Sequence, residues 1–191
     1  MVKKIKKNLR NIILVVFLIS FITTTFRIIT TKTQSLNTQF STLDFNQQFI
    51  GIAEVIDGDS LRIRNDNIKY EVRLFGIDAP EFHQTCFDEK DKEYNCGEIS
   101  RNFLLKLADK KETSCFYAQK DVYNRYLAIC KIDNIVINEE IVKNGMAIIY
   151  NLKQADENLI NLENLAKVNK LGVWQGKFQT PKDYRKSHKK K

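Results

Sequence analysis

The sequence predicts a mainly β, α+β fold, in which five strands form a small closed barrel accompanied by three helices. Two patterns support this prediction. Short segments that alternate apolar and polar residues are separated by turn residues, and longer segments carry apolar residues at helical spacing. Hydrophobic residues make up 43% of the 191-residue chain and only two residues are prolines, so a folded core is expected. The length fits one domain with terminal extensions.

Turn residues separate the expected strands. Asp57-Gly58-Asp59 follows the first strand and Asn65-Asp66-Asn67 follows the second, so the first three strands form a meander. The chain must leave this sheet before Pro80, because proline cannot donate a hydrogen bond to a strand ladder. The strands are expected at 50–56, 60–64, 68–74, 113–117 and 126–132, with a short continuation at 135–137.

Apolar stripes and helix-end residues define the three helices. One helix is expected over 98–110 and another over 158–170, because apolar residues recur on one face of each. Asn138 is placed to cap a short helix through Val142, and Gly145 supplies the stop that a glycine gives after a helix. Five strands in this meander-and-return order, with helices interposed, are typical of an OB-type barrel.

The first 29 residues have the pattern of an export signal. Five basic residues precede an apolar run at 12–22. That run is short for a membrane span, which needs about 20 apolar residues. No small-x-small cleavage site is visible, so a cleaved signal peptide and an inner-membrane anchor at 11–29 both stay open. We therefore expect a periplasmic, secreted or anchored protein, with membrane contact only through this segment.

The rest of the chain divides by composition. Residues 30–47 are rich in Thr, Gln, Ser and Asn and are expected to be a linker, residues 48–176 form the domain, and 177–191 form a basic tail. Seven of the 31 basic residues lie in 1–43 and seven in the tail, which contains one of the 23 acids. The body is therefore left with 17 basic and 22 acidic residues. The formal charge of +8 consequently says little about what the domain binds, although the tail could hold an anionic partner.

The four cysteines all lie in the body. An even number behind an export signal favours two disulfides over metal or redox chemistry, and the spacing lacks the close pairs of a zinc site. Three pairings are possible. The most local are Cys86–Cys96 and Cys115–Cys130, of which the second would join two neighbouring strands.

Asp57 and Asp59 place two carboxylates in one tight turn, across Gly58. Carboxylate oxygens are the ligands that a hard cation takes. Asp-Gly is also a common hairpin turn, so this motif by itself fits a plain turn better than a metal site. An EF-hand is excluded, because Leu61 and Ile68 stand where that loop needs an oxygen ligand and a glutamate.

Arg73 ends the third strand, and Asp78 and Glu81 follow on the loop that leaves it. Arginine donates two parallel hydrogen bonds to phosphate oxygens and keeps its charge. Asp78 could complete a cation site, and Glu81 could hold or deprotonate a water. A plainer interpretation pairs Arg73 with a neighbouring carboxylate such as Glu71 or Asp78.

Arg125 supplies a second arginine at the entry of a strand. It stands beside Tyr123, an aromatic residue that could stack on a sugar or base. Loop arginines are common, so this segment alone does not decide between a binding role and a surface role.

The chain carries three segments in this order, VIDGDS, VRLFGIDAPE and DVYNRYLA, followed by INEEIVKNGMAIIY and LGVW. Through these segments the chain resembles the staphylococcal nuclease (thermonuclease) family over residues 49–174. The resemblance implies a five-stranded OB barrel with three helices. It also implies a calcium-dependent endonuclease, a phosphodiesterase that hydrolyses DNA and RNA, and we expect a monomer. The resemblance is closest to exported bacterial members with cysteines near the same positions, which strengthens the two local disulfide pairings.

The resemblance also implies a ligand set for Ca²⁺. Asp57, Asp59 and Asp78 match the family's metal carboxylates. Ala79 matches a residue that contributes its backbone carbonyl, so the alanine side chain at this position need not weaken the metal site.

The catalytic roles follow from the same match. Glu81 matches the residue that positions or activates the attacking water, and Arg73 and Arg125 match the two arginines on the scissile phosphate. Tyr123 and Tyr150 match tyrosines that contact the substrate.

Two positions depart from the family pattern. Val122 stands where the best-known member has a lysine, which weakens the expected grip on the nucleic-acid backbone. Asn124 stands where a glycine is usual, and asparagine tolerates left-handed turns. The alternative is a non-catalytic nucleic-acid-binding module on the same barrel, but none of the expected carboxylates or arginines is lost. A membrane-tethered structural protein would leave that set of residues unexplained.

Overall fold

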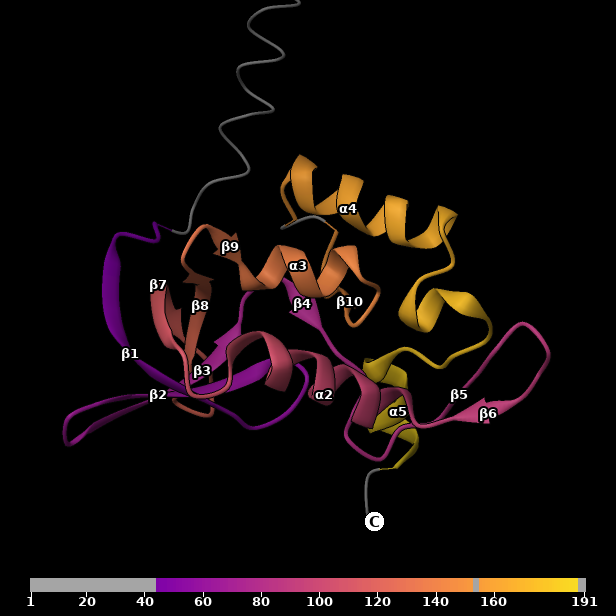
Figure 1. Ribbon diagram of the computed structural model, residues 1–191, viewed down its shortest axis with the longest axis horizontal. Coiled ribbons are helices and arrows are strands. Elements are labelled where there is room, and N and C mark those ends of the chain that lie inside the picture. Colours follow the sequence, from indigo (N-terminus) through magenta and orange to yellow (C-terminus); the bar gives the residue numbers. More distant parts are fainter. Residues whose placement is uncertain (1–43, 153–154, 189–191) are drawn as a thin grey trace, which may run out of the picture. The chain divides into compact units, whose positions relative to one another are not determined.

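A computed structural model describes residues 44–152 and 155–188 of the chain (Figure 1). The expected signal or anchor at 1–29 and most of the expected linker at 30–47 lie outside these residues. Within the described part, no helix has the length and apolar character needed to cross a membrane.

Five long strands close into a barrel of mixed pairing. Antiparallel neighbours run in the order β3-β2-β1-β7-β8, and a parallel pairing between β3 and β8 closes the ring. This arrangement confirms the mainly β, five-stranded OB barrel expected from the sequence. The strands are β1 (Gln47–Val55), β2 (Ser60–Asn65), β3 (Ile68–Leu74), β7 (Glu112–Lys120) and β8 (Tyr126–Ile132), with β9 (Ile135–Val136) added beside β8.

The alternation of apolar residues explains the barrel interior. Leu61 and Ile63 on β2 and Val72 and Leu74 on β3 are at most 1% exposed, while the residues between them face outward. The register sets Leu61 opposite Val72, so a slip by one residue would turn this whole set away from the core. The burial pattern therefore fixes which side chains point outward, among them Arg73.

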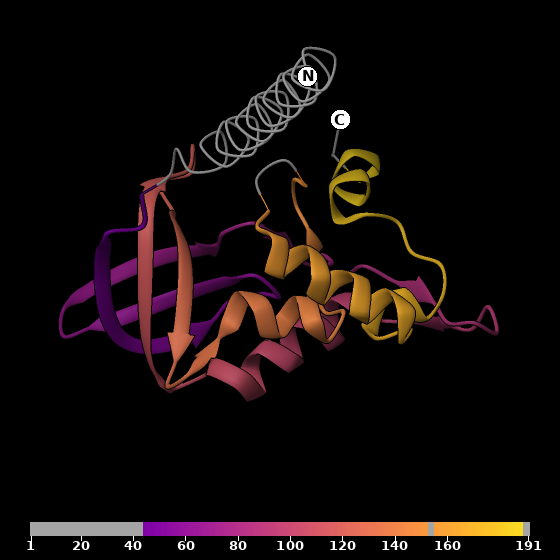
Figure 2. The same cartoon turned by 90° about the horizontal axis from the view of Figure 1, so that it is seen from above.

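Four helices accompany the barrel in the described part of the chain. Three correspond to the predicted ones: α2 (Cys96–Ala108), α3 (Ile137–Lys143) and α4 (Glu157–Val168). They lie side by side next to the barrel, with α3 between α2 and α4 (Figures 1 and 2). The prediction of three helices was one short, because the expected basic tail contains α5 (Pro181–Ser187), which follows the 3₁₀ turn η1 (Gly172–Gln175).

Two short strand pairs organise the loops. β4 (Ile77–Asp78) pairs with β10 (Ile148–Ile149), which anchors the loop after β3 to the region around α4. β5 (Cys86–Phe87) pairs with β6 (Glu93–Tyr94) in the hairpin that projects away from the barrel (Figure 1).

Both local disulfides are present, as predicted. Cys86 is bonded to Cys96 at the base of the β5–β6 hairpin, and Cys115 is bonded to Cys130. Cys115 and Cys130 stand directly opposite each other in the β7–β8 register, so this second bridge joins two neighbouring barrel strands.

The prediction that Asn138 caps α3 was wrong, because its side chain bonds to the barrel backbone instead. The helix begins one residue earlier, at Ile137, and its first turn has no side-chain cap. The buried amide of Asn138 donates to the carbonyl oxygens of Phe75 (2.9 Å) and Ala128 (3.2 Å) and accepts from the backbone N–H of Cys130 (3.1 Å). These bonds satisfy backbone groups beside the β3–β8 closure, and leaving such buried groups unpaired is costly.

Replacing Asn138 by alanine should lower the free energy of unfolding by about 1–3 kcal/mol, because it strands buried backbone groups. Urea denaturation measures this change. Asn169→Ala is the matched control, since the Asn169 amide donates to the carbonyl of Leu165 at an exposed helix end (2.9 Å). Equal small effects of the two substitutions would contradict the role given to Asn138.

Removing the barrel disulfide with Cys115→Ala and Cys130→Ala should cost about 3 kcal/mol, since a bridge across a loop of this length restricts the unfolded chain. The same measurement on Cys86→Ala/Cys96→Ala serves as the comparison, with a slightly smaller expected loss because the loop is shorter. Unchanged unfolding midpoints in both variants would refute a stabilising role for the bridges.

Candidate functional site

The turn between β1 and β2 carries the first two expected site residues. The backbone N–H of Asp59 donates to Oδ1 of Asp57 (3.1 Å), which shapes the turn. A Cβ atom on Gly58 would lie 2.4 Å from Oγ of Ser100 and 2.8 Å from Cβ of Ala79. Glycine is therefore required at this position because α2 and the loop after β3 approach the turn closely.

Asp59 is the most enclosed carboxylate of the turn, only 2% exposed. Its Oδ2 accepts from the backbone N–H of Ala79 (2.8 Å), and its Oδ1 accepts from Oγ of Ser60 (3.2 Å) and from Arg73. Burial raises the pKa of Asp59 to about 7, although the charge of Arg73 acts in the opposite direction. Positive charge beside Asp59 therefore has a large effect on whether the carboxylate is ionised.

Arg73 supplies that positive charge from the end of β3. Its Nη1 donates to Oδ1 of Asp59, and its Nη2 donates to Oδ1 of Asp78 (2.6 Å). Asp78 on β4 is likewise 2% exposed. One guanidinium thus spans two buried carboxylates that come from separate loops. The ion pair between Arg73 and Asp78, which the plainer interpretation of the sequence expected, is one of these two contacts.

Glu81 reaches the same cluster through a second arginine that the sequence interpretation did not single out. Nη1 of Arg185, on α5, donates to Oε1 of Glu81 (2.7 Å) and to Oδ1 of Asp78 (3.0 Å). Its Nη2 donates to Oδ2 of Asp78 (2.9 Å). Hydrogen bonding to Asp78 raises the pKa of Arg185 further above its ordinary value, against the effect of burial. Arg73, Arg185 and the three carboxylates therefore form one continuous charged network.

Arg125 lies on the loop before β8 and has its own carboxylate partner. Its Nη2 is 2.7 Å from Oδ2 of Asp121, and its guanidinium lies 5.5 Å from the ring centre of Tyr123. Burial opposes ionisation of Asp121, but hydrogen bonds from the backbone and side chain of Arg125 outweigh it and lower the pKa of Asp121. Asn124 in this loop has φ of +65°, the left-handed conformation expected for it.

The parallel closure of the barrel relates the two expected phosphate arginines. Arg73 is paired in register with Leu127, two residues after Arg125. Arg125 directly precedes β8, so this pairing brings the loop of Arg125 next to the end of β3 that carries Arg73. Neither arginine contacts the other's carboxylate partner in the described structure.

The three remaining expected site residues, Tyr123, Tyr150 and Ala79, lie outside the charged network. Tyr123 is 77% exposed and Tyr150 is 55% exposed, so both have surface available to a ligand. The backbone N–H of Tyr150 donates to the carbonyl of Gly76 (2.9 Å), which places it near the start of β4. Ala79 is buried beside Asp59.

The donor chemistry of these residues fits a hard cation, although the described side chains are not arranged as a metal centre. Within residues 44–152 and 155–188, no group of three or more acidic, histidine or cysteine side chains is positioned to hold a metal ion. Asp59 and Asp78 nevertheless face one shared positive group, the guanidinium of Arg73, and both are buried oxygen donors. Asp57 accepts from the backbone N–H of Asp59 (3.1 Å), and its carboxylate also interacts with that of Asp59.

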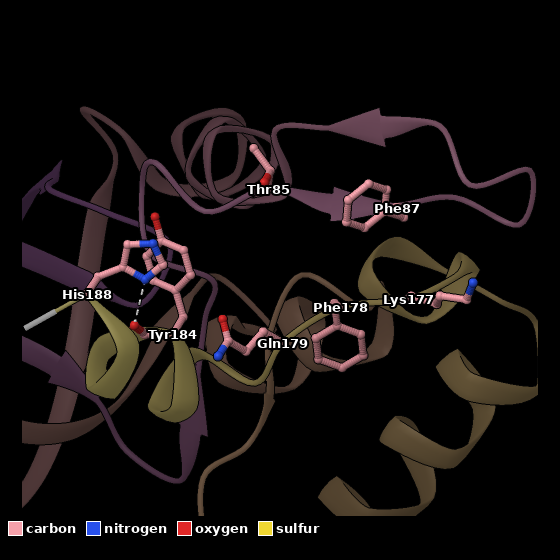
Figure 3. Close-up of a pocket in the computed structure, with 7 residues that line it drawn as sticks. All are labelled: Thr85, Phe87, Lys177, Phe178, Gln179, Tyr184 and His188. Carbon is pink, nitrogen blue, oxygen red and sulfur yellow. Dashed lines mark hydrogen bonds between the residues drawn. The ribbon is translucent and has the colours of Figure 1, made fainter.

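A pocket beside the network is formed by the tail and the β5 segment. Figure 3 shows it between Thr85 and Phe87 on one side and the tail residues on the other, with the Tyr184 and His188 rings stacked 3.9 Å apart. None of the expected site residues lines this pocket. Its importance for the site is that it marks where the tail crosses the loop that follows Glu81.

The sequence contains a helix-start signal for α5, the helix in the tail that was not predicted. Thr180 accepts from the backbone N–H of Asp183 (3.2 Å), and Pro181 occupies the first turn, the usual arrangement for a capped helix. Thr-Pro-x-Asp therefore indicates a helix in the expected tail. That Arg185 on this helix reaches Asp78 and Glu81 depends on the tertiary path of the tail and has no local signal.

Comparison with known proteins agrees with this architecture. The family model described as "Staphylococcal nuclease homologue" matches residues 71–176. A succinoglycan biosynthesis protein, ExoI, of Rhizobium meliloti is 32% identical over 133 residues, which cover 68% of this chain and 66% of that protein. A protein of Escherichia coli O157:H7 named an uncharacterized endonuclease is 28% identical over 131 residues, covering 68% of this chain and 79% of that protein.

A third relative comes from a fungus. A protein of Sclerotinia sclerotiorum named a probable endonuclease is 27% identical over 132 residues, which cover 62% of this chain and 48% of that protein. The family match includes Arg73, Asp78, Glu81 and Arg125, and it lies on the barrel, helices and loops described above. By this match and by its barrel, the chain belongs to the staphylococcal nuclease family.

Proposed function

We propose that this chain is an exported, calcium-dependent nuclease that hydrolyses phosphodiester bonds of DNA, RNA or both. The observation that carries the proposal is the guanidinium of Arg73 bridging the buried carboxylates of Asp59 and Asp78. Carboxylate oxygens that can hold a cation, next to a planar phosphate-binding group, supply the positive charge that stabilises the transition state of phosphodiester hydrolysis. The endonuclease names of relatives in Escherichia coli and Sclerotinia sclerotiorum give further support.

In this proposal Asp57, Asp59, Asp78 and the carbonyl of Ala79 hold the calcium ion. When bound, the ion supplies positive charge to the phosphate oxygens. Arg73 and Arg125 bind the scissile phosphate and offset the negative charge that builds up on its equatorial oxygens. Because Arg125 is oriented by Asp121, its guanidinium is held in place before substrate arrives.

Glu81 is proposed to hold and deprotonate the attacking water. Its side chain is 39% exposed, so water can reach it, while the carboxylate is held by Arg185 through Oε1. A base that is both accessible and oriented suits this task, since proton transfer requires direct hydrogen-bond reach. Tyr123 and Tyr150, both exposed, are proposed to contact the nucleic acid beside this centre.

The proposed export rests on two features of the chain. The basic start and apolar run in the first 29 residues have the pattern of an export signal. Two disulfides in the domain fit an oxidising compartment outside the cytosol.

The purified chain should cleave DNA or RNA in the presence of calcium and lose this activity when a chelator is added. Gel analysis of a defined oligonucleotide measures both states, and restoring calcium should restore cleavage. Unchanged cleavage in chelator would remove the calcium requirement. Binding without cleavage under every condition would instead support the non-catalytic module.

Arg73→Ala should lower kcat by about 10²–10³-fold, as typically follows the loss of one donor to a developing negative charge. Arg64→Ala is the control, because Arg64 lies on the neighbouring strand β2 and pairs with Glu54 at the surface. The rates are compared at saturating calcium and substrate. A similar, small loss in both variants would show that Arg73 has no special role.

A further inference from the structure

The tail helix brings an arginine into the centre of the proposed site. Arg185 makes two hydrogen bonds to Asp78 and one to Glu81, so its planar fork joins the expected metal ligand to the expected base. This residue lies beyond the 71–176 segment matched by the family model. Its side chain is 36% exposed, whereas Asp78 is almost fully enclosed, so the arginine closes the cluster from the solvent side.

The tail is attached to the domain along its length. The backbones of Phe87 and Lys177 exchange hydrogen bonds of 2.8 and 2.9 Å. The buried amide of Gln84 donates to the carbonyl of Gln179 (2.6 Å), and the hydroxyl of Tyr184 donates to the carbonyl of His83 (3.2 Å). Figure 3 shows this path, with Lys177, Gln179 and Tyr184 following the segment that contains Thr85 and Phe87.

The attachment acts on the loop of Glu81 itself. The backbone N–H of Glu81 donates to Oε1 of Gln84 (3.2 Å), while the other end of that amide binds Gln179 of the tail. Tail and base are therefore connected twice, through Gln84 to the backbone of Glu81 and through Arg185 to its carboxylate. Each such hydrogen bond restricts the rotamers of a loop carboxylate. Without these partners the side chain of Glu81 would keep most of its conformational freedom.

The carboxylate of Glu81 depends on this connection. Within the described part of the chain, Arg185 makes the only ion pair to Glu81, at Oε1, and no described group donates to Oε2. Oε2 is thus the oxygen at which a water could be held. Arg185 also balances the negative charge of Asp78, so that Arg73 does not have to neutralise Asp59 and Asp78 alone.

We propose that Arg185 is a positioning residue for the nuclease reaction, acting through Glu81. The proposal rests on the proposed function. Arg185 fixes the Glu81 carboxylate so that Oε2 receives the proton of the attacking water, while the guanidinium itself stays on Glu81 and away from the phosphate. The tail is therefore part of the catalytic unit. One of its positive charges, that of Arg185, acts at a defined position in the site, in addition to any general attraction of the tail to nucleic acid.

Steady-state kinetics of full-length variants test this role. Arg185→Ala should lower kcat by about 10–100-fold, the usual cost of losing a group that orients a site residue, with KM for an oligonucleotide changed by less than about threefold. Arg185→Lys should recover only part of the rate, because an ammonium lacks the fork that spans two carboxylates. Lys186→Ala should behave like the parent, because Lys186 lies on the same helix but pairs with Asp183 at the surface.

A double-mutant cycle separates positioning from other roles. If Arg185 acts through Glu81, adding Arg185→Ala to Glu81→Gln should lower the residual rate by less than about threefold, because the effects of residues that work as a unit do not add. Binding of a non-cleavable phosphorothioate oligonucleotide, measured by fluorescence anisotropy, should stay within about threefold in Arg185→Ala. Thermal melting of each variant checks that the fold is kept.

Each contrary result overturns the proposal in a recognisable way. A raised KM and weakened binding in Arg185→Ala would make Arg185 a substrate contact, and fully additive losses in the cycle would place its action elsewhere. Faster cleavage by Arg185→Ala would make the tail an inhibitory cover that competes for Asp78. An active parent with an unaffected Arg185→Ala variant would remove this proposal alone, whereas an inactive parent would remove the proposed function with it.

Discussion

The charged network around Arg73 is the constraint on which the site depends. Asp59 and Asp78 are buried carboxylates, and bringing two such groups together is unfavourable unless positive charge and hydrogen bonds accompany them. Arg73 meets this requirement from the end of β3 by contacting both. The β1–β2 turn, the end of β3 and the short strand β4 are thereby held to one another by one side chain. The same positive charge that stabilises the folded arrangement is the group proposed to receive a phosphate.

Much of the fold follows from local patterns in the sequence. The alternation in 60–64 and 68–74 places Leu61, Ile63, Val72 and Leu74 inside, because strand periodicity assigns side chains to faces without regard to distant partners. The opposed positions of Cys115 and Cys130 likewise agree with the expected neighbouring strands. Asn138 was assigned wrongly because asparagine at a helix start usually caps the helix, whereas here its amide serves the backbone of two barrel strands.

The candidate site was predictable as a set of residue types but not as a set of contacts. The residues of VIDGDS and VRLFGIDAPE identify Asp59, Arg73 and Asp78, and the structure joins these three. The contribution of the tail was not predictable, because the charge count only distinguishes an acidic body from basic ends. The contact of Arg185 with Asp78 and Glu81 depends on the path of the chain after η1, and no short sequence pattern encodes that path.

The parallel pairing of β3 with β8 has a consequence for the order of folding. Val72 and Tyr126, which meet in this pairing, are far apart in the chain, and contacts between distant segments carry a large loop-closure cost and form slowly. This pairing brings Arg73 next to the start of β8, which Arg125 directly precedes. A partly folded chain with the β1–β2–β3 meander in place would still lack the second arginine, and the proposed activity would therefore report completion of the barrel, well after secondary structure has formed.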